Sequence, residues 1–375
     1  MAPVTPKLQD YKRCVLKIGS SLLVNAQTGE IRKQWLAGII ADMFEILPQN
    51  ADLLIVSSGS VALGRKALNI KTQTQDLPKR QAAAAVGQIV LAEAYQHVLH
   101  AHDRQGAQCL LTLQDTEQRG RHLNARAALD ELLAAGIVPI INENDTVATA
   151  QVRYGDNDRL AARVATMISA EVLIVLSDVD GLYEKNPYLY PDATHVPIVT
   201  QIDKHIEAMA GGAQNAAASG GMKTKIAAAR IAVMAGCAMI IAAGREDHAL
   251  RNLGDGKARA TWFLPTLTPQ AARKRWIAGT LSPKGTLVID HGALKALKQG
   301  RSLLPAGVSN VTGHFQRGDA VYVDDAHGNH LAIGLSAYDA KDCHAIKGQH
   351  SRDIATIVQQ PGRDEMIHRD DLALL

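Results

Sequence analysis

Short runs of apolar and β-branched residues alternate along the first two thirds of the chain with longer stretches rich in alanine and leucine. The short runs are typical of buried strands, and the longer stretches have the spacing of amphipathic helices. The pattern predicts strands at residues 13–18, 52–57, 108–113, 136–141, 171–176 and 237–243. It predicts helices at residues 80–99, 123–135 and 223–235.

Strands that are apolar throughout and alternate with helices favour a mainly parallel central sheet sandwiched by helices, which is an α/β fold. In such a sheet, ligands bind beyond the carboxyl ends of the strands. The polar segments SSGS (57–60), NEND (142–145) and SDVDG (177–181) each follow a predicted strand. We therefore expect these three segments to line one cleft.

The pattern changes near Leu264, where prolines and a short basic cluster precede short runs separated by glycine and aspartate. Runs of this kind predict a small β-rich domain. The predicted organisation is a first domain over residues 1–264, a linker over 265–281, a β-rich domain over 282–360 and a carboxy-terminal tail over 361–375.

Composition limits the class of protein. The 375 residues are enough for two domains, and 47% hydrophobic with 21% charged residues indicates a globular protein. A net charge of +3 gives no general attraction to nucleic acid or anionic lipid.

No apolar run approaches the roughly 20 residues that span a bilayer, and the amino terminus has no secretory pattern. With four cysteines and no CxxC pair, we expect reduced thiols and a cytoplasmic location.

Two lysine-containing segments are candidates for binding an anion. Lys17 stands in an apolar strand, where an unpaired ammonium is unfavourable, so it needs an anionic partner. A lysine whose ammonium reaches solvent from the end of the strand is the alternative. The segment SGGMKTK (219–225) opens a predicted helix, where glycines and the helix start favour an anion. Lys223 and Lys225 point to nearly opposite sides of that helix, so one of them is expected to enter the site. A glycine-rich loop with solvated lysines is the alternative for this segment.

Short acids and amides crowd residues 142–158, after a predicted strand. They suit a metal, a sugar or a substrate with a positive charge. Asp156, Asn157 and Asp158 can equally cap the helix expected to begin near Arg159. Asp178, close to the end of another strand, is placed to bridge two cationic groups.

Taken in order, these blocks resemble the amino acid kinase family, and most closely its branch that phosphorylates glutamate. The resemblance rests on VLKIGSS, VSSGSVALG, AAVGQ, LNARAAL, VPIINENDTVAT, GDND, SDVDGLY and GGMKTK. Residues 300–323, GRSLLPAGVSNVTGHFQRGDAVYV, resemble the PUA domain appended to bacterial members of that branch.

The resemblance implies transfer of the γ-phosphoryl group of ATP to the side-chain carboxylate of L-glutamate, the first step of proline biosynthesis. Lys17 and Lys225 match the lysines that contact the phosphates, and Asp178 would hold both in place. Ser177 and Asp178 match the nucleotide-binding pair. The rest of the implied nucleotide loop is Ser219, Gly220, Gly221, Met222, Lys223 and Thr224.

The same resemblance assigns glutamate binding to Ser58, Asp145 and Asn157. Asp145 suits the α-ammonium, and Ser58 and Asn157 offer hydrogen-bond donors to carboxylate oxygens. No general base is needed, because the attacking carboxylate is ionised at neutral pH. Mg²⁺ would be coordinated mainly by the nucleotide phosphates, so no metal site formed by the protein alone is expected.

Partners are also implied by the resemblance: proline as a feedback inhibitor, a separate γ-glutamyl phosphate reductase, and further copies of the chain in a homo-oligomer. Acetylglutamate kinase, aspartokinase and uridylate kinase are the alternatives within the family, and no membrane partner is expected. RNA binding by the PUA-like region is a weaker alternative. Residues 282–350 carry seven Lys and Arg against six Asp, a near-neutral balance that gives little attraction to phosphates.

Overall fold

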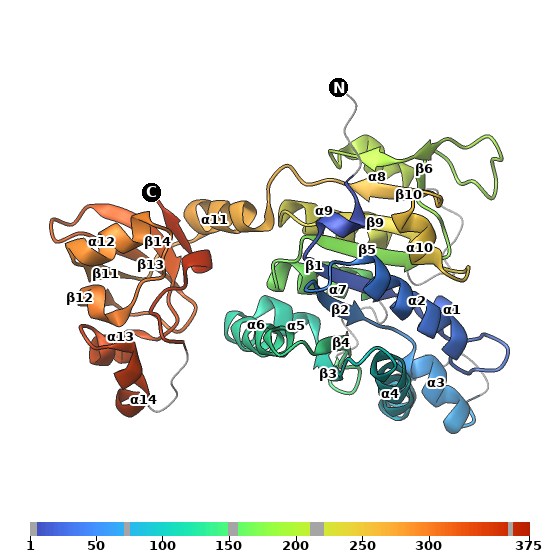
Figure 1. Cartoon of the computed structure of the whole chain (residues 1–375), viewed down its shortest axis with the longest axis horizontal. Helices are drawn as coiled ribbons and strands as arrows, with labels where there is room; N and C mark the ends of the chain where they lie inside the picture. The colour runs from blue at the N-terminus through green and yellow to red at the C-terminus, as the bar shows by residue number, and fades with distance from the viewer. Residues whose placement is uncertain (1–5, 71–75, 149–156, 211–220, 359–362) are drawn as a thin grey trace. The chain divides into compact units, whose positions relative to one another are not determined.

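The protein is described by a computed structural model, which covers residues 6–70, 76–148, 157–210, 221–358 and 363–375. The chain divides into two compact units, Met1–Pro269 and Gln270–Leu375 (Figure 1). Among the described residues, none of the helices combines the length and the apolar character that crossing a membrane demands.

The first unit is built on an eight-stranded sheet with the order β3-β4-β2-β1-β5-β9-β10-β8. All neighbours in it are parallel except β9 and β10, so the expected mainly parallel α/β sheet is confirmed. Its strands are β1 (Arg13–Ile18), β2 (Asp52–Val56), β3 (Gly106–Leu111), β4 (Val138–Glu143), β5 (Val172–Ser177), β8 (Ile198–Val199), β9 (Ala238–Ala243) and β10 (Ala260–Phe263).

Helices cover both faces of this sheet (Figure 1). They are α1 (Ser20–Leu23), α2 (Lys33–Ile46), α3 (Ser60–Ala67), α4 (Leu77–His100), α5 (Leu113–Glu117), α6 (Arg119–Ala134), α7 (Asn157–Met167), α8 (Lys204–Met209), α9 (Met222–Met234) and α10 (Ala249–Gly254). A 3-10 turn, η1 (Leu8–Asp10), precedes β1, and a small ribbon pairs β6 (Leu182–Tyr183) with β7 (His195–Val196).

Alternate residues of β1 belong to two different cores, as the two-residue period of a strand requires. Leu16 and Ile18 pack in the core under α2, α4 and α10. Val15 packs in the opposite core, under α6, α7 and α9. Lys17 shares the face of Val15, so the strand directs its side chain towards α7 and α9.

One predicted strand is displaced. The sequence pattern placed a strand at 108–113, but β3 ends at Leu111. Thr112 accepts a hydrogen bond from the backbone amide of Asp115, and Asp115 accepts one from the amide of Thr112. This capping box starts α5 at Leu113, so the last apolar residue of the predicted strand belongs to a helix.

Helices α3 and α4 approach each other very closely at two glycines. A Cβ atom on Gly64 would lie 1.8 Å from the carbonyl oxygen of Ala83, and one on Gly87 would lie 1.9 Å from that of Ser60. No side chain fits at either position. The contact fixes the start of α3, at Ser60, against the middle of α4.

The second unit contains a five-stranded sheet with the order β12-β11-β13-β14-β15. Its strands are β11 (Gly285–Ile289), β12 (Val308–Gly313), β13 (Ala320–Asp324), β14 (His330–Leu335) and β15 (Leu372–Leu374). Its helical segments are α11 (Pro269–Thr280), α12 (His291–Lys298), η2 (Pro305–Gly307), α13 (Ala340–Ile346), η3 (Ser351–Asp353), α14 (Ile354–Ile357) and η4 (Arg369–Asp371). The expected small β-rich unit is therefore present.

Two segments of this unit differ from the sequence expectation. The predicted linker, 265–281, contains helix α11, whose Ile277 is fully buried with Ala320 and Ile333 of the second sheet. The predicted tail, 361–375, contributes strand β15, which pairs with β14. Both were missed because the apolar signal is short: α11 shows mostly basic and small residues, and β15 is three residues long.

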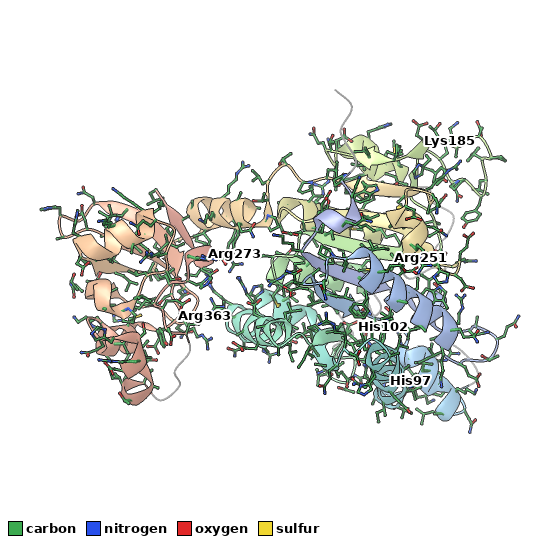
Figure 2. All side chains as sticks on the ribbon, viewed as in Figure 1. His97, His102, Lys185, Arg251, Arg273 and Arg363 are labelled. Atoms are coloured by element: carbon green, nitrogen blue, oxygen red, sulfur yellow. The ribbon has the colours of Figure 1, made fainter. Side chains whose placement is uncertain are left out.

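The segment α11 is also held by charge. Arg273 pairs with the buried Asp371, and Arg363 lies 3.6 Å from the other carboxylate oxygen (both arginines are labelled in Figure 2). The contact between Arg273 and Asp371 joins residues 98 positions apart in the sequence, and it makes α11 part of the second unit.

Candidate active site

The structure brings Lys17 and Lys225 to a single carboxylate, that of Asp158. The Nζ atom of Lys17 lies 2.5 Å from Oδ1 of Asp158, and that of Lys225 lies 3.2 Å from Oδ2. The three side chains come from β1, α9 and α7. They meet on the face of the sheet that the alternation of β1 assigns to Lys17.

All three residues of this charge cluster are buried: Lys17 is 8% exposed, Lys225 5% and Asp158 2%. Burial by itself would raise the pKa of Asp158. The charges and hydrogen bonds of the two lysines outweigh burial and lower that pKa below its ordinary value. Asp158 is therefore an anion at neutral pH, and the cluster carries one excess positive charge.

The first turn of α9 supplies Lys225 and turns Lys223 away from the cluster. Lys223 is exposed and Lys225 is buried. Thr224 bonds the carbonyl of Gly221 at 2.8 Å and lies 3.5 Å from Asp158. The helix begins at Met222 with Gly221 as its N-cap, and the positive end of the helix dipole favours an anion. Ser219 and Gly220, expected in the nucleotide loop, lie outside the described residues, as does Asp156.

Next to the charge cluster is a network of amides and hydroxyls. The Nδ2 atom of Asn157 donates to the backbone carbonyl of Ser57 (2.6 Å), to Oγ of Ser58 (2.7 Å) and to Oδ1 of Asn142 (3.0 Å). Ser57 also shares a 2.9 Å hydrogen bond with the buried Tyr95. The loop after β2, the end of β4 and the start of α7 thus meet at one point.

Asp145 lies at the edge of this network. It is 9% exposed, and its Oδ2 atom is 3.5 Å from the hydroxyl of Ser60. Burial raises the pKa of Asp145 to about 6, although the charge of Arg80 and the hydroxyl of Ser60 act in the opposite direction. A buried carboxylate that accepts, among the described residues, one hydrogen bond at 3.5 Å is suited to receive a cation.

Asp178 does not hold the two lysines. It is exposed, accepts a hydrogen bond from Ser177 at 3.1 Å and lies 3.9 Å from Arg245. Asp158 occupies the bridging position instead, which corrects the expectation for Asp178. The reason is geometric. Asp158 is on α7, the helix that packs on the face of the sheet towards which Lys17 points, whereas Asp178 comes after the end of β5 and is exposed to solvent.

The sequence contained a signal for Asp158. It follows Asn157 directly, within the polar cluster, and precedes an apolar helix. Its interpretation as a helix cap concealed the role that the structure gives it. Only the pairing of β1, α7 and α9 in space distinguishes the two possibilities.

Chemically, the site combines a part suited to an anion with a part suited to a small molecule that carries both charges. The charge cluster offers two ammonium groups and the start of a helix to an anion such as a polyphosphate. The adjacent network offers a buried carboxylate, an amide and hydroxyls to a small molecule that carries both charges. Asn157 and Asp158, neighbours in the chain, join the two. Within the part of the chain that the structure describes, no three His, Cys, Asp or Glu side chains form a group that could hold a metal ion.

Comparison with known proteins identifies the family of the chain. Residues 12–243 match the model of the amino acid kinase family, and residues 285–358 match that of the PUA domain. Glutamate 5-kinase of Rhodopseudomonas palustris (strain BisB18) is 55% identical over 98% of both chains. Glutamate 5-kinase of Bradyrhizobium sp. (strain BTAi1) is 53% identical over 99% of this chain and 98% of that one.

Among solved structures, carbamate kinase from Giardia lamblia bound to AMP-PNP aligns with 68% of this chain and 99% of that one, at 17% identity and a TM-score of 0.47. The two glutamate 5-kinases, by contrast, match along nearly the whole chain at more than half of the aligned positions. The chain therefore belongs to the amino acid kinase family, and within it to the glutamate 5-kinases.

Proposed function

We propose that the chain transfers the γ-phosphoryl group of ATP to the side-chain carboxylate of L-glutamate and so forms γ-glutamyl phosphate and ADP. One observation carries the proposal: Asn157 and Asp158 are consecutive residues of α7, and one joins the amide network while the other joins the two lysines. A substrate held by the network is thereby next to a phosphate held by the lysines.

The reaction requires alignment and charge neutralisation rather than a base. An oxygen of the ionised γ-carboxylate attacks the γ-phosphorus, and the bond from that phosphorus to the oxygen of ADP breaks. Both reactants are anions. A lysine about 4 Å from one phosphate charge contributes roughly 4 kcal/mol of attraction at an effective dielectric constant of ~20, before desolvation. Lys17 and Lys225 offer two such groups, and Asp158 fixes where they point.

Glutamate recognition is assigned to Ser58, Asp145 and Asn157. Asp145 would bind the α-ammonium as a carboxylate, and the amide of Asn157 and the hydroxyl of Ser58 would bind carboxylate oxygens. Proline presents the same amine and α-carboxylate, which supports competitive inhibition by proline. A labile acyl phosphate product also supports a separate reductase as pathway partner.

For the nucleotide, we assign Ser177 and Asp178 together with the loop that leads into α9. The buried ammonium groups and the helix start fit a polyphosphate. Mg²⁺, when bound with ATP, would supply further neutralisation of phosphate charge. Cytoplasmic location and assembly of several copies are parts of the same proposal.

The test is an assay in which hydroxylamine traps the acyl phosphate formed from glutamate, ATP and Mg²⁺. The panel includes N-acetylglutamate and aspartate, which would also give acyl phosphates, and we expect the hydroxamate only with glutamate. Uridine monophosphate would give a diphosphate that hydroxylamine does not trap, so for this acceptor the release of ADP is measured, and we expect none above background. Lys225→Met should remove most activity. Lys257→Met, which removes an exposed lysine paired with Asp255, is the matched control and should leave activity unchanged. Turnover of another acceptor in place of glutamate would overturn the proposal.

A further inference from the structure

Gln88 is a buried polar residue that the roles described above do not use. It lies in the middle of α4 and is 7% exposed. Its neighbour Gly87 forms the close contact with the carbonyl of Ser60, at the start of α3. Gln88 is thus next to one of the close contacts between α3 and α4, beside the amide network.

The hydrogen bonds of the network fix which way each amide faces. The carbonyl of Ser57 can only accept, so the atom of Asn157 that faces it is Nδ2. The backbone amide of Glu143 can only donate, so the atom of Asn142 that faces it is Oδ1, at 2.9 Å. The Nδ2 atom of Asn142 must then face Gln88 and Ser60.

This orientation determines that of Gln88. Asn142 donates to Oε1 of Gln88 at 2.8 Å and to Oγ of Ser60 at 3.2 Å. The Nε2 atom of Gln88 is left on the other side. It is buried and has no hydrogen-bond partner within the described residues. Turning the carboxamide over would place two donors against each other, so the unpaired donor cannot be removed by a flip.

A buried donor without an acceptor lowers the stability of the fold. Replacing Gln88 by methionine would remove this unpaired donor but would also take from the buried Nδ2 atom of Asn142 one of its two acceptors, so the two effects on stability oppose each other. The oxygen of Gln88 has one described use, which is to hold the side chain of Asn142. Asn142 in turn contacts Asn157 on one side and, through Ser60, Asp145 on the other.

We propose that Gln88 is a positioning residue for the amino acid substrate: through Asn142 it orients the amide of Asn157 and the hydroxyl of Ser60. The inference rests on the proposed function, because Asn157 and Asp145 are the groups assigned to glutamate. It concerns the amino acid side of the site alone. The charge cluster of Lys17, Asp158 and Lys225 shares no hydrogen bond with Gln88 among the described residues.

The experiment compares Gln88→Met and Gln88→Asn with the unsubstituted full-length chain. Asparagine keeps the carboxamide but is one methylene shorter, so its oxygen falls short of Asn142. We expect the KM for glutamate to rise roughly tenfold in both variants, because one orienting hydrogen bond of about 1.4 kcal/mol is lost. The KM for ATP should stay within about twofold, since the phosphate groups are bound elsewhere. The melting temperature of Gln88→Met should change little, because loss of the bond to Asn142 is offset by removal of the unpaired donor.

Gln96→Met is the matched control, on the same helix. Gln96 accepts a hydrogen bond from the backbone amide of Gly106 at 3.1 Å, which is a structural contact away from the network. We expect a lower melting temperature and an unchanged KM for glutamate. If Gln88→Met does not fold, Gln88→Asn gives the result.

An unchanged KM for glutamate in a folded Gln88 variant overturns the inference, and so does an equal rise in both KM values. These results differ from a failure of the proposed function itself, in which the unsubstituted chain would form no hydroxamate from glutamate.

Discussion

Replacing Asp158 by asparagine is the most direct test of the charge cluster. The substitution keeps the shape of the side chain and removes one charge. At 2.5 and 3.2 Å, the two ion pairs each correspond to roughly 5 to 7 kcal/mol of attraction at an effective dielectric constant of ~20, before desolvation. Loss of the carboxylate leaves two ammonium groups, from Lys17 and Lys225, buried beside each other.

Two losses are expected in Asp158→Asn. The free energy of unfolding should fall by about 3–5 kcal/mol, the usual effect of removing one partner from a buried ion pair. The turnover number should fall by about 10²-fold or more, because the lysines are no longer held where a phosphate would need them. Denaturant unfolding and the hydroxamate assay measure the two effects separately.

A second substitution that restores the charge balance separates the loss of stability from the loss of activity. Adding Lys225→Met to Asp158→Asn removes one of the two repelling cations, so part of the lost stability should return while activity stays low. A single Asp158→Asn variant that keeps activity within about threefold of the unsubstituted enzyme would refute the reasoning, since 1 kcal/mol already corresponds to about fivefold.

The pH dependence of stability follows from the same group. The pKa of Asp158 is lowered in the folded protein, so the carboxylate stabilises the fold above the ordinary carboxyl pKa of about 4. That contribution is lost as the pH falls from there through the folded pKa. The difference in stability between the unsubstituted chain and Asp158→Asn should therefore be largest at neutral pH and shrink in acid.

Three further predictions concern other parts of the molecule. Because the pKa of Asp145 is raised to about 6, the KM for glutamate should fall as the pH rises from 5 to 7, and Asp145→Asn should abolish that dependence; an unaltered slope would contradict the assignment. Gly87→Ala should lower the free energy of unfolding by about 1–3 kcal/mol, because a Cβ atom would collide with the carbonyl of Ser60; a melting temperature equal to that of the unsubstituted chain would exclude the close contact. Arg273→Met should destabilise the second unit by about 1–3 kcal/mol in calorimetry and leave the KM for glutamate and ATP unchanged; no loss of stability would mean that the pair with Asp371 is not important.

Much of the first unit could be predicted from the sequence, because its signals are local. The apolar runs at residues 13–18 and 171–176 lie within one residue of β1 and β5. Parallel strands buried on both faces are apolar throughout, and that pattern is readable without knowledge of the partners. The polar segments after β2, β4 and β5 lie at one edge of the sheet, because these strands are parallel and their carboxyl ends point the same way.

The parts that were missed depend on contacts between distant residues. Asp158 looks like a helix cap until α7 is placed beside β1. Helix α11 has an apolar face of few residues, and only the second sheet shows what Ile277 is buried against. The role of Gln88 depends on the orientation of Asn142, a residue 54 positions further along the chain, to which it is hydrogen-bonded only in the folded protein. Composition and periodicity contain none of this information.

The charge cluster also has a consequence for synthesis of the chain. Lys17 belongs to an early strand, whereas its counter-ion and the second lysine belong to helices made much later. A growing chain that has reached only β4 would have to bury an ammonium group without an anion, which is unfavourable. Strand β1 therefore cannot be fully buried while the ribosome is still translating the first half of the unit. We expect the nascent kinase unit to depend on protection from aggregation until α7 has emerged.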